Sequence, residues 1–343
     1  MEKHKARTLG IGIIRDGELV LTRYYGEQAP GIPASSDTMF NTASVSKAIT
    51  SEVAIRLIDR GVINLDEAIS GYYVHPDIKD DPRHTQLTPR ILLTHKTGFL
   101  NWPHSYEDGK LAFIRDPGEA YGYSGVGFDI FAYFLEQKLG KPFPQIVKDE
   151  LYTPLNMTKA SQHQEEWMHP FMVRPLDETG QFRDDIGLDL GYWNPADDLF
   201  VTVEDYARFL IAVMNNEGLS EDAIQLRQTV QSDLTNDPVW ECDDGGIDPC
   251  PSPYGHSVGW FVYGYGDRLN IQHGGNDMSE AATAYFKTDT RDGMIVFINA
   301  PNPEGIQMYV SVVDLLDEDQ YYTKIFHYLF EKFFSSESRR TRP

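Results

Sequence analysis

The sequence predicts an α+β fold in which a single antiparallel sheet is assembled from both ends of the chain. Residues 9–24 and the stretch from 257 to 299 show short apolar runs separated by Gly and Asp turns, which is typical of strands. The section between them is mostly helical and rich in loops. We predict one domain over residues 1–343, with a sheet lobe at about 1–70 and 255–343 and a helical lobe at about 71–254. A cleft between two such lobes is where an active site is expected.

Composition limits the classes of partner. The chain has 343 residues, 41% of them hydrophobic, and 52 acidic against 30 basic residues give a formal net charge of −22. This charge disfavours nonspecific binding to nucleic acid or to anionic membranes. The apolar stretch at 9–14 is too short for a signal sequence or a membrane span, so the sequence as given predicts a soluble protein of the cytoplasm, the alternative being a secreted protein whose leader has been removed. No feature predicts an oligomeric state.

The first elements are a hairpin and a helix. Residues 9–14 and 18–24 flank Asp16-Gly17, a strong hairpin signal. A helix then opens at Ser44, presents Ile49, Val53, Ala54 and Leu57, and ends at Gly61. Later helices are expected at 89–94, 125–139, 143–151, 203–214 and 321–334, and later strands at 257–263, 269–272, 281–287 and 294–299. The aromatic helix at 321–334 is expected to pack on one face of the sheet, the alternatives being a membrane or a dimer contact.

Ser44-Val45-Ser46-Lys47 carries the chemistry of the predicted site. At positions i and i+3 of a helix, a lysine amine can reach a serine hydroxyl, and a hydroxyl needs a base within hydrogen-bond distance before it can attack a carbonyl. Burial and a place in the first helical turn would both favour the uncharged amine. The alternative is an ordinary helix start with a capping serine and a solvated lysine.

Two later stretches complete a pattern, namely Tyr123-Ser124-Gly125 and His273-Gly274-Gly275. The order Ser-x-x-Lys, Tyr-Ser-x, His-x-Gly resembles the serine β-lactamase and D,D-peptidase superfamily, in particular its class C branch of esterases, amidases and D-aminopeptidases. The resemblance covers about residues 9–334. Taken separately, Tyr123 could be a core aromatic and His273-Gly274-Gly275 a simple turn.

The resemblance implies a role for each residue. Ser44 would be the acylated nucleophile, Lys47 its proton acceptor, and Tyr123 the second base. His273, Gly274 and Gly275 would line the pocket, and the backbone N–H groups of Ser44 and Asn276 would form an oxyanion hole. The resemblance therefore implies a β-lactamase-like serine hydrolase acting on a small ester, amide or peptide, with no metal and no organic cofactor.

Departures from the family pattern bear on the substrate. Tyr123-Ser124-Gly125 lacks the Asn that relatives often carry, which favours esters or small amides over penicillin-type chemistry. Asp197 or Asp198 could hold a substrate amine, or could be ordinary surface acids. The alternatives are a β-lactamase, a D-amino-acid peptidase or amidase, and, from another class, a non-catalytic sensor of penicillin or peptide.

Several other stretches imitate functional motifs. Lys96-Thr97-Gly98 spells a family motif, but we expect it in a loop after an apolar helix, with His95 as a buried hydrogen-bonding residue. Gly255-His256-Ser257-Val258-Gly259 matches the nucleophile elbow of α/β-hydrolases, which needs a helix after it. His163, His169, Glu165 and Glu166 lack the spacing of a helical zinc motif. Cys242 and Cys250 bracket a predicted surface loop and could form a disulfide or remain free thiols.

Overall fold

A sheet of nine antiparallel strands forms the centre of the molecule. The computed structural model describes residues 1–183, 189–239, 242, 250–318 and 320–334, and the strand order within this part is β3-β2-β1-β12-β11-β10-β9-β8-β7. Strands from the two ends of the chain meet where β1 (Thr8–Arg15) pairs with β12 (Gly293–Asn299). The predicted α+β class is therefore confirmed.

The remaining strands complete this sheet and a smaller one. The large sheet contains β2 (Glu18–Ala29), β3 (Ile32–Pro33), β7 (Ser232–Asp233), β8 (Tyr254–His256), β9 (Phe261–Tyr265), β10 (Arg268–Asn276) and β11 (Glu280–Lys287). The small one pairs β4 (Phe40–Asn41), β6 (Phe200–Val201) and β5 (Ala160–Ser161). In the predicted hairpin, Asp16 and Gly17 both have positive φ, at 47° and 79°. A two-residue turn whose twist matches the right-handed twist of the two strands requires positive φ at both positions.

The predicted strand at 257–263 is wrong in its first half. Strand β8 ends at His256, the chain bends over 257–260, and β9 begins at Phe261. Gly259 has a φ of 70°, and a Cβ at that position would lie 1.7 Å from the hydroxyl of Ser51. The break therefore lets the loop press closely against the helix that follows Ser44.

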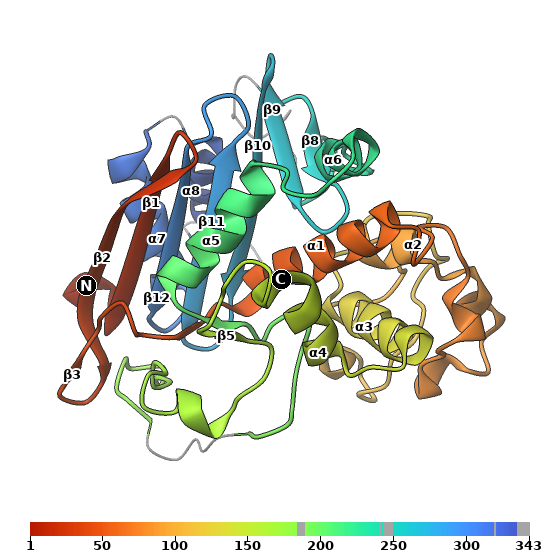
Figure 1. The fold of residues 1–343 in the computed structure, drawn as a ribbon, viewed down its shortest axis with the longest axis horizontal. Coiled ribbons are helices and arrows are strands. Elements are labelled where there is room, and N and C mark those ends of the chain that lie inside the picture. The colour runs from red at the N-terminus through yellow and green to blue at the C-terminus, as the bar shows by residue number, and fades with distance from the viewer. Residues whose placement is uncertain (184–188, 240–241, 243–249, 319, 335–343) are drawn as a thin grey trace.

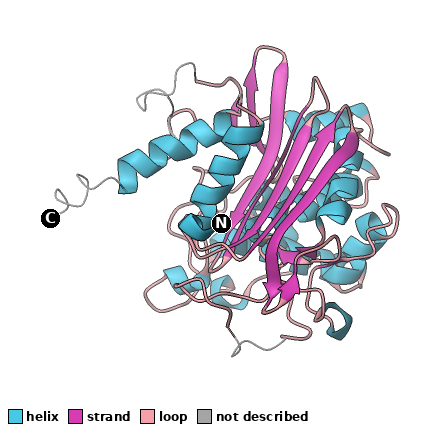
Figure 2. Ribbon diagram, turned by 90° about the vertical axis from the view of Figure 1, so that its left-hand side faces the viewer, coloured by secondary structure: helices cyan, strands magenta, loops and turns pink. Residues whose placement is uncertain are grey.

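Helices cover both faces of the sheet (Figure 2). They are α1 (Ser46–Asp59), α2 (Pro89–Leu93), α3 (Gly125–Leu139), α4 (Phe143–Val147), α5 (Val203–Met214), α6 (Glu221–Gln228), α7 (Glu304–Leu316) and α8 (Tyr321–Phe334). Helix α4 continues into a single π turn at Lys148–Tyr152. Helices α6 and α7 were not predicted, whereas the others match expected segments. Short 3₁₀ turns lie at Glu2–His4, Ala43–Val45, Ile69–Gly71, Pro76–Ile78, Pro82–Gln86, Pro103–Ser105 and Glu166–Met168.

The main core is continuous across the two predicted lobes. One buried cluster joins Ile49 and Val53 of α1 to Phe131 of α3, Phe209 of α5 and Phe297 of β12. Helix α5 lies against β1 and β12 on one face of the sheet, and α7 lies on the other face with α8 beside it (Figure 1). The lobe boundaries at about 70 and 255 stay a prediction, since α5 belongs by sequence to the helical section but packs on the sheet.

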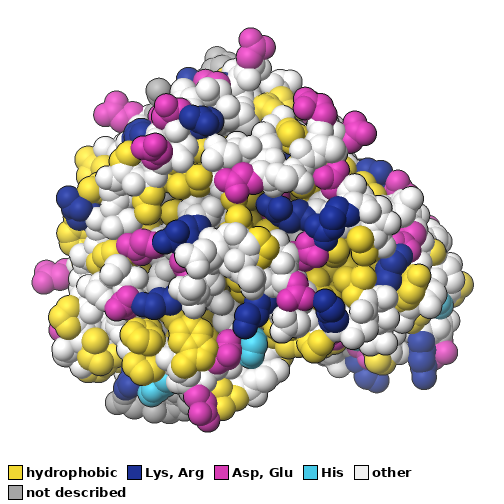
Figure 3. Space-filling model, in the orientation of Figure 1, with side chains coloured by type: hydrophobic (Ala, Val, Ile, Leu, Met, Phe, Trp, Pro, Cys, Tyr) yellow, Lys and Arg dark blue, Asp and Glu magenta, His cyan; other side chains and the backbone are white. Residues whose placement is uncertain are grey.

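Surface features agree with a highly charged chain. Acidic and basic side chains are interspersed over the face shown in Figure 3. Among the described helices, none combines the length and apolar character needed to cross a bilayer.

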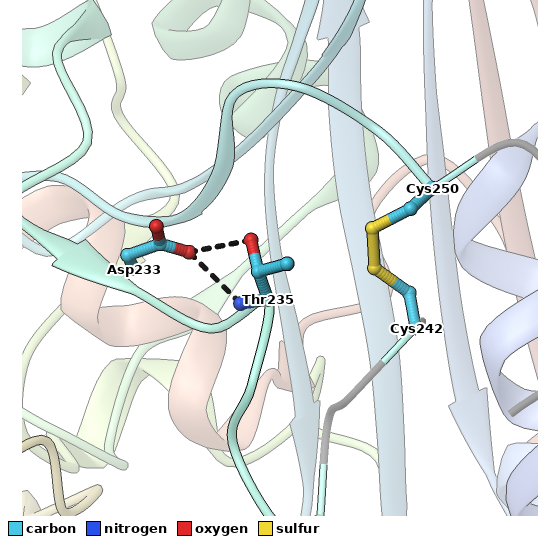
Figure 4. The surroundings of a disulfide bond; sticks show 4 residues. All are labelled: Asp233, Thr235, Cys242 and Cys250. Atoms are coloured by element: carbon cyan, nitrogen blue, oxygen red, sulfur yellow. Dashed lines mark hydrogen bonds between the residues drawn. A yellow bond between two sulfur atoms is a disulfide. The ribbon is translucent and has the colours of Figure 1, made fainter. Parts of the chain in front are cut away.

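Cys242 and Cys250 form a disulfide with their Cα atoms 5.5 Å apart, beside the Asp233–Thr235 turn (Figure 4). The predicted loop at 243–249 lies outside the described residues.

Candidate active site

The small sheet fixes the chain just before Ser44. Strand β4 ends at Asn41, and Ser44 follows in the 3₁₀ turn that leads into α1. Ala43 has a left-handed φ of 46°, held because its N–H donates to the Asn41 side chain at 3.1 Å and its carbonyl accepts from Ser46 at 2.6 Å. Such conformations are costly for a residue with a Cβ and are concentrated at functional sites.

Ser44 and Lys47 are in direct contact. The Lys47 amine donates to the Ser44 hydroxyl at 2.9 Å and to the carbonyl of Ala196 at 2.9 Å, and its side chain is completely buried. The Ser44 hydroxyl makes no capping hydrogen bond to the helix. The alternative of a capping serine and a solvated lysine is therefore wrong.

Tyr123 lies beside this pair, immediately before α3. The Lys47 nitrogen is 4.9 Å from the centroid of the Tyr123 ring, and His95 stacks on that ring at 4.3 Å. His95 is buried and accepts the Ser124 backbone N–H at 3.1 Å, as expected of a hydrogen-bonding core residue. Lys96-Thr97-Gly98 forms the loop after α2, also as expected.

The His273-Gly274-Gly275 motif lies on β10, next to Ser44. The ladder between β9 and β10 ends at Gln272, and β10 continues to Asn276 past the Ser44 turn. A Cβ on Gly275 would lie 2.4 Å from the Thr42 carbonyl oxygen and 2.8 Å from the Ser44 nitrogen. Only glycine therefore allows the strand to approach the nucleophile this closely.

Three buried imidazoles meet near Lys47. Burial lowers the pKa of His256 to about 3 and also lowers the pKa values of His95 and His273, and when Lys47 is protonated its charge lowers all three further. Each ring keeps one buried nitrogen with no hydrogen-bond partner among the described residues. Sequence reasoning missed His256, because an isolated histidine after Gly255 carries no signal of its partners.

An acidic rim, defined as Asp197, Asp198, Asp277 and Glu280, adjoins Ser44. The Ser44 hydroxyl donates to Asp197 at 3.4 Å, and Asn41 donates to Asp198 at 3.4 Å. Asp197 also shares a hydrogen bond with Asp277. Burial raises the pKa of Asp197 to about 6 and those of Asp198 and Glu280 to about 7, which like charges within the rim reinforce.

Ser44 opens into a cavity of about 360 Å³, a normal size for a small-molecule site. Its wall includes all the predicted site residues except Lys47, whose side chain is completely buried. The rest of the wall is mainly aromatic, from Tyr121, His256, Phe261, Tyr309, Tyr322 and Phe326. Sequence reasoning missed these residues, because aromatic residues on amphipathic helices and strands are indistinguishable from core.

The rival sites do not have the required geometry. Ser257 is fully buried and is followed by the strand β9, whereas a nucleophile elbow needs a helix after the serine. Within the described ranges, no three His, Cys, Asp or Glu side chains are grouped to hold a metal ion.

Comparison with known proteins agrees with this arrangement. The family model described as Beta-lactamase matches residues 1–315. The chain belongs to the beta-lactamase family. The predicted resemblance is thus confirmed, and the matched residues include Ser44, Lys47, Tyr123 and His273 but not helix α8.

Relatives in this family differ in activity. AmpH of Escherichia coli, a D-alanyl-D-alanine carboxypeptidase/endopeptidase, is 28% identical over 165 residues, covering 42% of this chain and 43% of AmpH. The match therefore spans less than half of that relative. A penicillin-binding protein homologue from Pyrococcus abyssi, which is octameric, superposes with a TM-score of 0.75 at 20% identity over 94% of this chain and 76% of that one. A class C beta-lactamase superposes with a TM-score of 0.73 at 15% identity over 93% of each chain. These two structures share the fold.

Proposed function

We propose that this protein is a serine hydrolase that cleaves a small ester or amide through an acyl-enzyme on Ser44. The observation that carries the proposal is the 2.9 Å hydrogen bond between the buried Lys47 amine and the Ser44 hydroxyl, which lines a cavity. A base within this distance of a hydroxyl is the basic requirement for nucleophilic catalysis. Membership of a family that includes peptidases and beta-lactamases supports it.

The proposed reaction has two halves. Ser44 Oγ attacks the carbonyl carbon while the uncharged Lys47 amine takes the hydroxyl proton. The tetrahedral adduct collapses, the bond to the leaving group breaks, and the Tyr123 hydroxyl passes a proton to the departing oxygen or nitrogen. Water then attacks the acyl-enzyme, gives one proton to the Tyr123–Lys47 pair, and releases the acid as Ser44 recovers its proton. The backbone N–H groups of Ser44 and Asn276 would stabilise the oxyanion in both halves.

The acidic rim supports a substrate whose acyl part carries an amine. Asp197 reaches the Ser44 hydroxyl itself, so a cation bound there would lie close to the scissile carbonyl. Carboxylates in a partly buried rim would favour an ammonium group, because the attraction between charges is stronger away from bulk water. Esters and amides of amino acids are the simplest compounds with this arrangement.

Serine variants test the proposed nucleophile. With a chromogenic ester, Ser44→Ala should abolish hydrolysis and Ser257→Ala should retain it. Full activity in Ser44→Ala would refute the proposal. A sensor that is acylated without turnover remains the second candidate, since the Asn of the family's middle motif is replaced by Gly125. It would give a stoichiometric burst of chromophore and then stop, whereas a hydrolase continues.

A further inference from the structure

We propose that the aromatic part of the Ser44 cavity is a binding site for an aromatic or bulky apolar leaving group, completed by helix α8. This aromatic chamber is defined by Tyr121, His256, Phe261, Tyr309, Tyr322 and Phe326. The inference rests on the proposed acyl transfer at Ser44 and adds the class of leaving group. None of the acidic residues of the rim lines this cavity.

The rings form a continuous wall that begins at Tyr123. His256 lies 6.2 Å from Tyr123 and 5.4 Å from Phe261, measured between ring centroids. Phe261 lies 5.9 Å from Tyr322, and Tyr322 lies 4.8 Å from Phe326. Such spacings are those of packed aromatic rings, so the wall is a preformed apolar surface.

Helix α8 forms part of the cavity wall as well as part of the hydrophobic core. A Cβ on Gly274 would lie 2.7 Å from the Tyr322 hydroxyl, so the glycine on β10 lets α8 close against the cavity. Tyr322 and Phe326 are one turn apart on the same helix, and both line the cavity. Since the family match ends at residue 315, this part of the wall lies outside the matched segment.

The position of the aromatic chamber beside Tyr123 indicates that it binds the leaving group rather than the acyl part. Tyr123, the proposed proton donor to the leaving group, lies on the same cavity wall as Tyr121 and His256. The acidic rim instead contacts Ser44 and Asn41, and Asn41 and Glu280 line a different cavity. The group that departs with the Tyr123 proton would therefore leave into the aromatic chamber, and the acyl part would face the rim.

Matched esters test the assignment. Alanine 2-phenylethyl ester and alanine ethyl ester share the acyl group, and their alcohols are similar in basicity, so they differ mainly in apolar size. We expect a preference of at least about tenfold in kcat/KM for the phenylethyl ester. Because both esters give the same alanyl-enzyme, their deacylation rates should be equal.

Variants of α8 test whether the preference for the phenylethyl ester depends on the aromatic chamber. Phe326→Ala should reduce the phenylethyl preference to less than about threefold, and Phe326→Trp should reduce it by filling the space. Leu329→Ala, on the same helix but outside the cavity wall, should keep it. A ratio of two substrates on one enzyme preparation is independent of how much protein is folded.

Other results would overturn the inference. Equal kcat/KM values for the two esters in a Ser44-dependent reaction would refute the chamber while leaving the hydrolase intact. If Phe326→Ala instead selectively impaired phenylalanine ethyl ester, the chamber would hold the acyl side chain, and the assignment would be wrong. Hydrolysis that persists in Ser44→Ala would refute the proposed function itself.

Discussion

At the scale of single residues, the environment of Lys47 is unusual for a lysine. Its amine is buried, bonds to one hydroxyl and one carbonyl, and faces the rings of Trp102, Tyr123 and Phe128 within 5.8 Å. Among the described residues, no carboxylate forms a direct ion pair with it, although Asp129 and Asp197 are close enough for their charges to interact with it. A structural lysine would be expected to carry such a partner, because an unpaired buried charge is costly.

Removal of this amine should therefore affect catalysis more than folding. We expect Lys47→Met and Tyr123→Phe each to lower kcat by at least about 100-fold, the usual contribution of a positioned acid or base. Circular dichroism should show an unchanged fold. The matched control is Lys96→Met, in the loop that imitates a family motif, and it should keep wild-type kcat. An active Lys47→Met variant would exclude the amine as the base.

The acidic rim should make recognition of an amine depend on pH. Asp197 has a pKa raised to about 6, and those of Asp198 and Glu280 are raised to about 7, so the rim gains negative charge as pH rises through that range. We expect the KM of alanine ethyl ester to fall as pH rises across this interval, whereas the KM of uncharged ethyl propionate should stay nearly constant.

The variant Asp198→Asn should weaken this pH dependence without abolishing hydrolysis of ethyl propionate, since Asp198 bonds to Asn41 and not to Ser44. Equal pH dependence of KM for the charged and the uncharged ester would contradict recognition of an amine by the rim.

At the scale of elements, a buried ion pair holds α1 in place. Glu52 of α1 accepts two hydrogen bonds from Arg227 of α6, at 2.6 and 2.7 Å, and one from the Trp260 indole at 3.0 Å. Both charged side chains are almost completely buried. This network joins the nucleophile helix to α6 and to the loop before β9.

Breaking the network should destabilise the whole protein. We expect Glu52→Gln to lower the free energy of unfolding by about 3 to 5 kcal/mol, because Arg227 would keep its charge without its carboxylate. The control is Arg60→Ala, which removes the exposed pair with Glu150 at the end of α1 and should cost less than about 1 kcal/mol. Urea denaturation measures the loss of unfolding free energy in each variant. Similar losses in the two variants would show that burial of the Glu52–Arg227 pair is unimportant.

The approach of β10 to Ser44 depends on one missing side chain. Gly275→Ala would place a Cβ against the backbone of Thr42 and Ser44, so the strand or the turn must shift by several tenths of an ångström. We expect kcat/KM to fall by about 100-fold, the usual effect of a small misplacement of reacting groups. Gly71→Ala, where a Cβ meets open space, should leave kcat/KM unchanged. Wild-type activity in Gly275→Ala would show that the close approach of β10 to Ser44 is not needed for the reaction.

Elements with a strong local signal could be predicted from the sequence, and those defined by tertiary contacts could not. Asp16-Gly17 dictates its hairpin, and the apolar stripe from Ile49 to Leu57 dictates α1. The sequence predicts strand through the bend at Gly259, because the contact that requires the bend is with Ser51 of α1, far away in sequence. The short, polar α6 carries no clear stripe, yet it supplies the buried partner of Glu52.

At the scale of the whole molecule, the site combines segments that no local pattern connects. The Ser-x-x-Lys, Tyr123 and His273 motifs could be found by their order, and the structure brings them to one cavity. The aromatic chamber could not be found, because Tyr309, Tyr322 and Phe326 sit on helices whose apolar faces also cover the sheet. Whether such rings face the core or a substrate depends on how α8 is placed against β10.

The buried imidazoles should make the stability of the whole molecule sensitive to acid. They come from the loop after α2, the end of β8 and β10, so their burial depends on the contact between the helical section and the sheet. His256 has an ordinary pKa of 6.5 that burial lowers to about 3 in the folded protein. Between these values the unfolded chain binds a proton that the folded chain does not, so stability is lost as pH falls below about 6.5. The carboxyls of Asp198 and Glu280 act in the opposite direction, since their folded pKa values of about 7 make the folded state the better proton binder.

A comparison of variants isolates the histidine contribution from that of the acids. We expect His256→Phe, which keeps a ring against Phe261 and His95, to lose less stability than the wild type as pH falls from about 7 to about 4. Urea midpoints across that range measure the difference, in which the contribution of the carboxyls cancels. If the two stability curves run parallel, His256 is protonated equally in both states, and the imidazole cluster is open to water rather than sealed between the sheet and the helices.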